Sequence, residues 1–431
     1  MDLTANAWIA MAIFITVYVF IVSEKFHKSI LVVLGALLLF LSRIYLPESG
    51  ESQLIEALGF VDFNVISLII GMMIIVQVTS SSGVFTHLAM KIILLTRGNL
   101  KYAFFLLMLM TAFITAFISN VTAVMVMTPI FLAICLRFHV NAIPFLMTEI
   151  LMSNIGGTAT PLGDMTNIII ASQAGFSFTK VVSVLGPVVL VIILVIGGLS
   201  TWWFSRELIP KKNIVLEDLA SDNFIHDRVL MIKGLSVLGL VVLGLIFKDW
   251  FALDNGTIAL SGAMILLLIT KIDPEEAFKK YVHWSIIFFF VGLFILIGAL
   301  EVTGVVERLA ELIVTMTGSD TKLLSMVLLW SSALFSAFID NIPFATTMIP
   351  IIQNIGVMTG TPTDPLFWAL ALGACIGGSG TIIGASCNLV VVGLAEQNGI
   401  KITFMQYMKY AFGMMLIAVS ISAVYLYLFI L

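Results

Sequence analysis

Long uninterrupted apolar stretches constrain this chain more than any other feature of its sequence. Val181–Ile196 and Leu235–Phe247 contain no charged residue. A helix that crosses a bilayer needs about 20 mostly apolar residues, and a backbone in lipid must satisfy its own hydrogen bonds, which a helix does. Only 11% of the residues are charged, too few to cover a soluble domain of this size. The sequence therefore predicts an all-α polytopic membrane protein and argues against a soluble enzyme.

Several other classes of protein lack support in the sequence. The net charge is −4 and no Lys/Arg-rich run occurs, so nucleic-acid binding has no electrostatic basis. The three cysteines and five histidines form no metal-ligand spacing, so neither a metal site nor a cofactor is predicted. The first apolar stretch, Ala5–Val22, follows Asp2 and no cation, which favours a retained span over a signal peptide.

The chain contains an internal duplication. Phe117–Ile130 (FISNVTAVMVMTPI) and Phe338–Ile351 (FIDNIPFATTMIPI) share six of 14 residues at an offset of 221 positions. Ile155–Asn167 (IGGTATPLGDMTN) and Ile376–Asn388 (IGGSGTIIGASCN) share six of 13 at the same offset. A constant offset over more than 100 residues indicates two copies of one unit.

Each copy is expected to hold an odd number of membrane spans. In the first copy they are about Ala5–Val22, Ile30–Tyr45, Val65–Ser80, Ala142–Gln173 and Val181–Phe204. Between the third and fourth, two apolar arms of about 15 residues are marginal in length for crossing a hydrocarbon core of ~30 Å, which predicts a re-entrant hairpin. With five spans in each copy, the second copy enters from the opposite side. The prediction is two inverted repeats, an architecture typical of secondary transporters.

The predicted boundaries follow from this count. The first repeat covers 1–205 (hairpin 104–135, broken helix 142–173), a polar linker covers 206–233, and the second repeat covers 234–431 (hairpin 323–355, broken helix 365–395). If the linker is cytoplasmic, both termini lie outside. That assignment puts 16 of the 21 Lys and Arg residues inside and five outside, in line with the positive-inside rule. We therefore expect a multi-pass protein of the plasma or inner membrane.

Polar sequence recurs at membrane depth in both copies. It occurs at the two hairpin tips and at the glycine-rich breaks of the two broken helices. Irregular backbone in a bilayer survives only inside protein or beside a water-filled cavity, where it offers carbonyls to cations and helix N-termini to anions. The alternative is that these glycines serve close helix packing. The predicted solute- or ion-binding residues are Ser119, Asn120, Thr122, Gly156, Gly157, Thr158, Thr160, Asn167, Asp340, Asn341, Gly377, Gly378, Ser379, Thr381 and Asn388.

Three carboxylates break the internal symmetry. Asp340, at the second tip, aligns with Ser119, and Asp164, after the first break, aligns with Ala385. Glu149 lies in the half-helix before that break. Buried carboxylates in membranes are costly and are candidates for function, so all three are predicted proton-coupling residues. Asp164 is equally suited to cap a helix, and Glu149 to make a packing hydrogen bond.

These residues resemble motifs of the ion transporter superfamily. The pairs FISN…TP with FIDNIP…IP, and SNIGGTATPLGDMTN with IGGSGTIIGASCN, resemble arsenite/antimonite permeases and permeases like the melanosomal P protein. The resemblance covers nearly the whole chain. It implies a scaffold domain that forms a homodimer in many members, a mobile transport domain with both hairpins and both broken helices, and an elevator-type, ion- or proton-coupled cycle.

The resemblance carries over to particular positions. It implies that Asn120 and Asn341 are the tip asparagines, that Gly156-Gly157 and Gly377-Gly378 are the glycine breaks, that Asn167 and Asn388 close the breaks, and that Asp164 is the acid before the first closing asparagine. Two departures stand out. The third tip positions are Val121 and Ile342 where dicarboxylate transporters have Thr, and no Lys or Arg is expected near either tip or break to pair with a carboxylate substrate. Both departures argue against citrate-like dianions.

The preferred function from sequence is proton-coupled efflux of a small inorganic solute, with arsenite/antimonite first. Neutral As(OH)₃ needs no buried counter-charge. A soluble ATPase is a further expected partner if the protein is an arsenite pump. The alternatives are a sodium/proton antiporter, with H⁺ or Na⁺ as coupling ion, and uptake of an anion or carboxylate. An intramembrane aspartyl protease using Asp164 and Asp340 is disfavoured, because paired glycine breaks have no role in proteolysis.

Overall fold

The computed structural model describes all residues except 1–3, 23–25, 46–51, 210–224, 252 and 319. The described chain is helical, with no β-strand among these residues. Eight of its helices are long and apolar enough to cross a membrane, and several shorter apolar helices of 10–17 residues accompany them. The predicted all-α membrane fold is confirmed.

The two repeats have matching helix orders. The first contains α1 (Ala5–Val22), α2 (Lys28–Leu41), α3 (Gln53–Leu58), α4 (Phe63–Ser80), α5 (Val84–Leu95), α6 (Leu100–Phe117), α7 (Asn120–Phe138), α8 (Ile143–Gly157), α9 (Met165–Gln173) and α10 (Phe178–Trp203). The second contains α12 (Arg228–Ile246), α13 (Lys248–Phe251), α14 (Asn255–Thr270), α15 (Pro274–Tyr281), α16 (Trp284–Val302), α17 (Val305–Thr317), α18 (Thr321–Ser336), α19 (Asn341–Thr359), α20 (Asp364–Gly377), α21 (Ser386–Gln397), α22 (Phe404–Tyr425) and a π-helical end, η1 (Leu426–Ile430).

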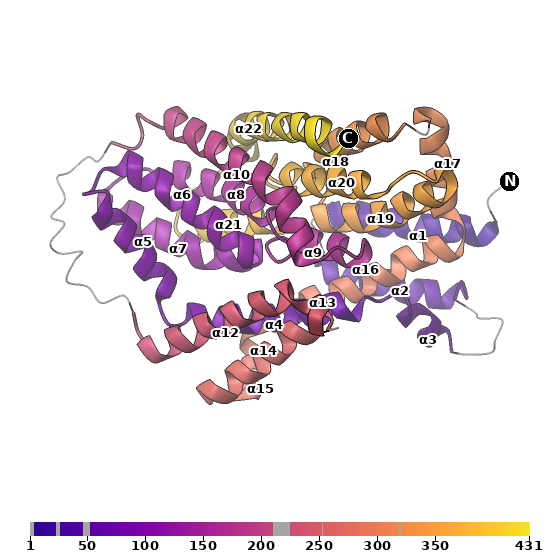
Figure 1. Ribbon diagram of the computed structural model, residues 1–431, viewed down its shortest axis with the longest axis horizontal. Coiled ribbons are helices and arrows are strands. Elements are labelled where there is room, and N and C mark those ends of the chain that lie inside the picture. Colours follow the sequence, from indigo (N-terminus) through magenta and orange to yellow (C-terminus); the bar gives the residue numbers. More distant parts are fainter. Residues whose placement is uncertain (1–3, 23–25, 46–51, 210–224, 252, 319) are drawn as a thin grey trace.

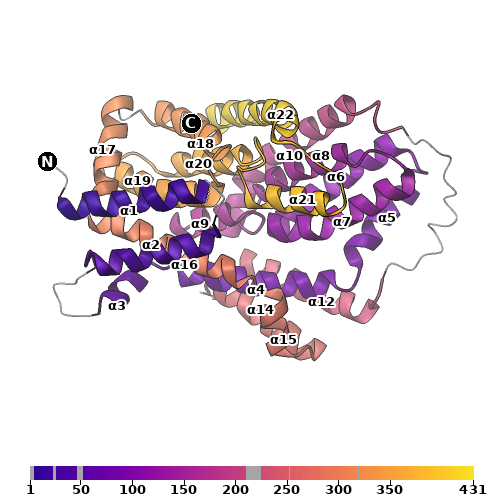
Figure 2. The ribbon, with the colours of Figure 1, turned by 180° about the vertical axis from the view of Figure 1, so that it is seen from behind.

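The helices form two bundles (Figures 1 and 2). In the flanking bundle, which we define as α1–α4 and α12–α16, α4 packs on α12 and α14, and α2 packs on α1 and α16. The hairpin bundle consists of α5–α10 and α17–α22. There the repeats interlock, because α7 contacts α21, and α9 contacts α19 and α20.

Equivalent glycines start equivalent helices in the two repeats. Gly83 precedes α5 with φ 84°, and Gly304 precedes α17 with φ 76°. A left-handed backbone costs little only for glycine. The matched glycines, 221 positions apart, thus produce the same sharp turn twice.

The hairpin arms are longer than the sequence estimate. α6 and α7 have 18 and 19 residues, and α18 and α19 have 16 and 19. The estimate of about 15 counted only the most apolar run, whereas the helices continue into polar ends such as Lys101 and Arg137. Arm length therefore does not distinguish a re-entrant hairpin from two crossings, and re-entrance stays a prediction.

The helices on either side of the two breaks cover 143–173 and 364–397. The second repeat begins earlier than predicted, because α12 starts at Arg228 after the N-cap Asp227, whose carboxylate accepts from the Val229 amide at 2.8 Å. Residues 210–224 of the predicted linker lie outside the described part of the chain. The short helices α3 and α5 were not anticipated.

Candidate functional site

Each helix break is closed by the asparagine that follows it. Asn167 Nδ2 donates to the Thr158 carbonyl at 2.9 Å. Asn388 Nδ2 donates to the carbonyls of Gly378 at 2.8 Å and Thr381 at 2.9 Å. These amides satisfy carbonyls that the interrupted helix leaves unpaired. The same device in both repeats holds the break in one conformation.

The breaks are also tied to the hairpins. The hydroxyl of Thr160 donates to the Ala116 carbonyl, and that of Thr381 donates to the Ala337 carbonyl. Ser379 Oγ donates to the Ile376 carbonyl at 2.6 Å within its own helix end. These three hydroxyls, which the sequence predicted to bind solute, therefore donate their hydrogen bonds to backbone carbonyls within the hairpin bundle.

The break glycines allow backbone to touch backbone. A Cβ atom on Gly156 would overlap Ala112 of α6, and one on Gly377 would lie 2.5 Å from the Ala333 carbonyl oxygen of α18. Real Cβ atoms essentially never stand this close to a backbone atom. The close packing that the sequence offered as an alternative is therefore present at both glycines, and their part in solute binding stays a prediction.

Asp164 joins the two hairpin tips. Its Oδ2 accepts from Asn120 Nδ2 at 2.8 Å and from Asn341 Nδ2 at 3.2 Å. Its Oδ1 accepts from the Thr166 amide at 2.9 Å, which makes Asp164 the N-cap of α9, as the sequence allowed. The side chain is buried. These three N–H donors all point at one carboxylate, and hydrogen bonds to a charged acceptor are stronger than those between neutral groups.

The tip backbones dock on the breaks in the same way. The Asn120 amide donates to the Gly163 carbonyl at 2.9 Å, and the Asn341 amide donates to the Gly384 carbonyl at 3.2 Å. At the first tip, Thr122 is buried, and the buried hydroxyl of Ser119 has no hydrogen-bond partner among the residues that the structure describes. The structure thus brings together both tips, both breaks and Asp164.

The second tip has a cation partner that the sequence did not reveal. Lys28 Nζ lies 2.6 Å from Asp340 Oδ2. Ser386 Oγ donates to the same oxygen at 2.7 Å, and Asp340 Oδ1 accepts from the Ile342 amide at 3.2 Å as N-cap of α19. The expectation that no Lys or Arg lies near a tip is wrong, because α2, from 312 positions earlier in the chain, begins beside α19.

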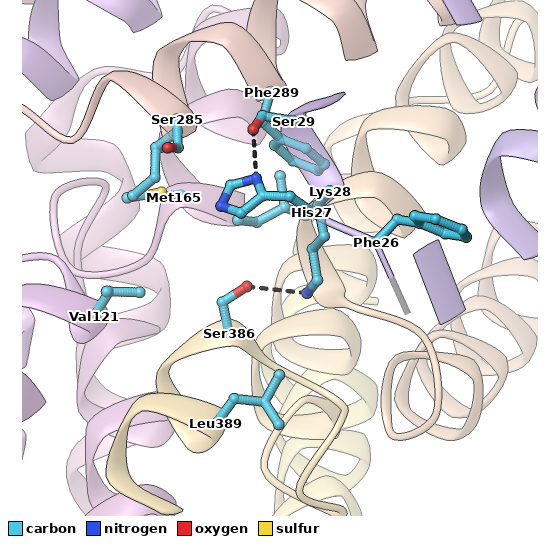
Figure 3. A pocket seen from close by; sticks show the side chains of 12 residues that line it. Phe26, His27, Lys28, Ser29, Val121, Met165, Ser285, Phe289, Ser386 and Leu389 are labelled. Carbon is cyan, nitrogen blue, oxygen red and sulfur yellow. Dashed lines mark hydrogen bonds between the residues drawn. The ribbon is translucent and has the colours of Figure 1, made fainter. Parts of the chain in front are cut away.

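A cavity of about 570 Å³ lies beside these groups. Its described lining contains one lysine, one histidine and no carboxylate, and is otherwise hydroxyls and apolar side chains. Figure 3 shows Lys28 reaching toward Ser386, and His27 bonded to Ser29, with Nδ1 and Oγ 2.6 Å apart. The lining residues are Phe26, His27, Lys28, Ser29, Val121, Met165, Ser285, Ile286, Phe289, Ile342, Ser386 and Leu389.

Helix N-termini surround this cavity. The first turns of α7, α9, α19 and α21 contribute Val121, Met165, Ile342 and Ser386. Lys28 and Ser285 come from the first turns of α2 and α16 in the flanking bundle. The N-terminal end of a helix carries partial positive charge, and such ends commonly bind anions. Six such ends meet at this cavity, and the carboxylates of Asp164 and Asp340 cap two of them, α9 and α19.

Glu149 lies apart from this cavity. It is fully buried in α8, and its Oε1 accepts from Thr128 Oγ1 of α7 at 2.8 Å. Within the described part of the chain, its Oε2 has no hydrogen-bond partner. The contact with Thr128 is the packing hydrogen bond that the sequence offered as an alternative. The cysteines are buried and line no described part of the cavity.

Comparison with known proteins finds relatives described as membrane proteins and transporters. A family model described as citrate transporter (CitMHS) matches residues 18–373. A 46 kDa membrane protein of Mycobacterium leprae is 36% identical over 425 residues, covering 97% of this chain and 98% of that one. An uncharacterized transporter of Mycobacterium tuberculosis is 35% identical over 424 residues, with the same coverage.

More distant relatives extend the comparison. The human P protein is 30% identical over 502 residues, covering 97% of this chain but 59% of that protein. A crystal structure of the Alcanivorax borkumensis YdaH transporter shares the fold, with a TM-score of 0.62 over 93% of this chain and 97% of that one, at 13% identity. The matched motifs, the helical fold and the match over residues 18–373 agree, and this chain belongs to the CitMHS citrate transporter family, a family of membrane transporters within the ion transporter superfamily.

Proposed function

We propose that this protein is a secondary transporter that moves a small anion together with protons. The observation that carries the proposal is the cavity at the two hairpin tips, whose described lining has one lysine and no carboxylate. Desolvating an anion is costly unless the site supplies opposite charge and donors. Lys28, the nearby hydroxyls and the surrounding helix N-termini supply both.

The family supports the same solute class. Its description names citrate, which is a carboxylate, and small carboxylates are therefore the first solutes to test. The sequence argument against carboxylates depended on the lack of a Lys or Arg near the tips, and Lys28 removes that premise. Anion uptake, the last of the sequence alternatives, becomes the preferred one.

Proton coupling is proposed because a carboxylate stands beside the cavity. Asp340 is 3% exposed, and it contacts Lys28 and Ser386, which both line the cavity. A buried membrane carboxylate can alternate between charged and neutral forms and so carry a proton. Asp164, whose oxygens accept from three donor groups, stays a second candidate for carrying the proton.

The other sequence predictions stay open to the same experiment. Arsenite/antimonite efflux, with its soluble ATPase partner, and sodium/proton antiport each predict a different active solute. We further propose that the hairpin bundle moves against the flanking bundle in an elevator-type cycle, as a homodimer in the plasma or inner membrane. The division of the helices into two bundles supports this movement.

The test uses purified protein in liposomes with an internal pH-sensitive dye. Citrate, succinate, phosphate, arsenite and Na⁺ are added separately, with protein-free liposomes and Lys101→Gln, an exposed cation far from the tips in sequence, as controls. We expect one of the anions to acidify the lumen as it enters. Acidification or alkalinisation caused only by arsenite would support the metalloid transporter, and a response only to Na⁺ would support the antiporter; either result would overturn the proposal.

A further inference from the structure

Lys28 and Asp340 form an ion pair that joins the two bundles at the cavity. Lys28 is the first residue of α2 in the flanking bundle, and Asp340 caps α19 in the hairpin bundle. The nitrogen and oxygen are 2.6 Å apart. In the other repeat the helix equivalent to α2 is α14, which begins at Asn255, and the residue equivalent to Asp340 is Ser119, so the internal symmetry does not repeat this pair. Because this ion pair occurs at only one of the two tips, it is suited to couple one anion to one proton at a single site.

The two partners differ in their access to the cavity. The Lys28 side chain is 24% exposed and lines the cavity, while the Asp340 side chain is 3% exposed and lies behind it. Ser386 bridges them, because its hydroxyl donates to Asp340 at 2.7 Å and accepts from Lys28 at 3.3 Å. An anion in the cavity can therefore reach the ammonium of Lys28 without passing Asp340.

We infer that Lys28 exchanges partners during transport, pairing with Asp340 when the cavity is empty and with the solute anion when Asp340 is protonated. This inference rests on the proposed function and specifies how anion and proton are coupled. With Asp340 ionised, the pair is neutral, and an entering anion would add an uncompensated charge beside a buried carboxylate. A proton on Asp340 Oδ2 frees the ammonium, and the anion restores neutrality.

The exchange balances charge and protons. One proton moves from solvent to the Asp340 carboxylate as one negative charge of the solute pairs with Lys28, whose ammonium keeps its protons throughout. On the other side of the membrane, the proton leaves as the anion leaves, and the ion pair forms again. Either ligand alone leaves an unpaired buried charge, so the two travel together.

Other titratable groups lie near the ion pair, and the experiment must distinguish their pH responses from that of Asp340. His27 lies beside Lys28 on the cavity wall. Tyr18 of α1, Asp164 before α9 and Cys387 of α21 interact electrostatically with Asp340. Histidine is the side chain that most readily changes charge near neutral pH, so a pH response that belongs to His27 must be separated from one that belongs to Asp340.

The experiment measures radiolabelled anion uptake and dye-reported proton influx together, for wild type and for Lys28→Gln, Lys28→Arg, Asp340→Asn and His27→Gln. The Asn variant keeps an oxygen that can cap α19 at the Ile342 amide, and Asp340→Ser, which installs the residue found at the first tip, is a second variant if Asn impairs folding. Thermal unfolding in detergent checks each protein.

Three results are expected. Lys28→Gln loses about tenfold or more in uptake, and Lys28→Arg retains part of it because the charge remains. Asp340→Asn still exchanges anion but no longer brings protons, and its exchange becomes independent of pH. His27→Gln keeps the wild-type ratio of protons to anions.

Each contrary result has one meaning. If both Asp340 variants fold and keep the wild-type proton-to-anion ratio, or if Lys28→Gln transports like wild type, the inference is wrong while the proposed function stands. If His27→Gln alone abolishes the pH response, the coupling group is His27 and the inference is overturned. If wild type moves no anion, the proposed function itself fails.

Discussion

The side-chain amide of Asn154 donates to the side-chain carbonyl of Asn388 at 2.9 Å, joining helices of different repeats in the buried centre of the hairpin bundle. The equivalent positions in the other repeat are Cys375 and Asn167, and there the thiol donates to the amide oxygen at 3.4 Å. Residue i of one repeat thus meets residue j of the other, and j meets i. This reciprocity is the pattern of a two-fold axis between the repeats.

Removal of the Asn388 side chain should destabilise the protein strongly. Asn388→Ala leaves the Asn154 amide and the carbonyls of Gly378 and Thr381 without this partner, and each buried polar group left unsatisfied costs about 1–3 kcal/mol. The measurement is thermal unfolding in detergent, followed with a thiol-reactive dye that detects exposure of the buried cysteines. Asn398→Ala, at an exposed site, is the control and should unfold near the wild-type temperature. Equal unfolding temperatures for the two variants would contradict the proposed closure of the break.

A methyl group at the break glycines should also be destabilising. Gly377→Ala places a Cβ atom 2.5 Å from the Ala333 carbonyl oxygen, so α18 and α20 must separate. Overpacking of this kind costs about 1–3 kcal/mol. The control is Gly393→Ala in α21, where a Cβ atom meets nothing within 4 Å; there alanine should stabilise the helix by up to about 1 kcal/mol. The same thermal unfolding assay measures both, and a stable Gly377→Ala variant would show that the helix contact is not close-packed.

Asp164 is expected to be essential for holding the tips together. In Asp164→Asn, one oxygen must replace two, so at least one donor among Asn120, Asn341 and the Thr166 amide loses its acceptor. The expected loss of stability is about 1–3 kcal/mol, and uptake into liposomes should fall with it. Asp320→Asn alters an exposed N-cap and should change neither quantity, since Asn and Asp cap helices equally well. A fully active Asp164→Asn variant would rule out the tip-joining role.

Glu149 offers a test of the proton route predicted from sequence. Glu149→Gln keeps an oxygen that can accept from Thr128 and removes the charge, so the protein should unfold at the wild-type temperature or slightly above it. If Glu149 carries a coupling proton, accumulation driven by a pH gradient should fall about tenfold while exchange of labelled for unlabelled solute continues. Unchanged accumulation would leave the packing hydrogen bond as its role.

Much of the architecture could be predicted from sequence, because the signals are local or periodic. Apolar length determines the spanning helices, and the offset of 221 places both hairpins and both breaks. Asp164 as a cap follows from its position just before a helix. A charge difference between the repeats also marked Asp340. The same comparison does not extend to Lys28, because the offset of 221 pairs it with Asp249 of α13, whereas α2 corresponds to α14.

The sequence by itself determined the helices and the polar interruptions, since these depend on residues near one another in the chain. It also determined the duplication, since the motifs recur at one constant offset of 221. The tertiary structure decided which of these residues meet. Lys28 and Asp340 are 312 positions apart, and their contact depends on how α2 lies against the start of α19. That contact places a lysine at the cavity wall beside a buried carboxylate, because packing between distant helices, which no local pattern specifies, sets the charge at a buried site.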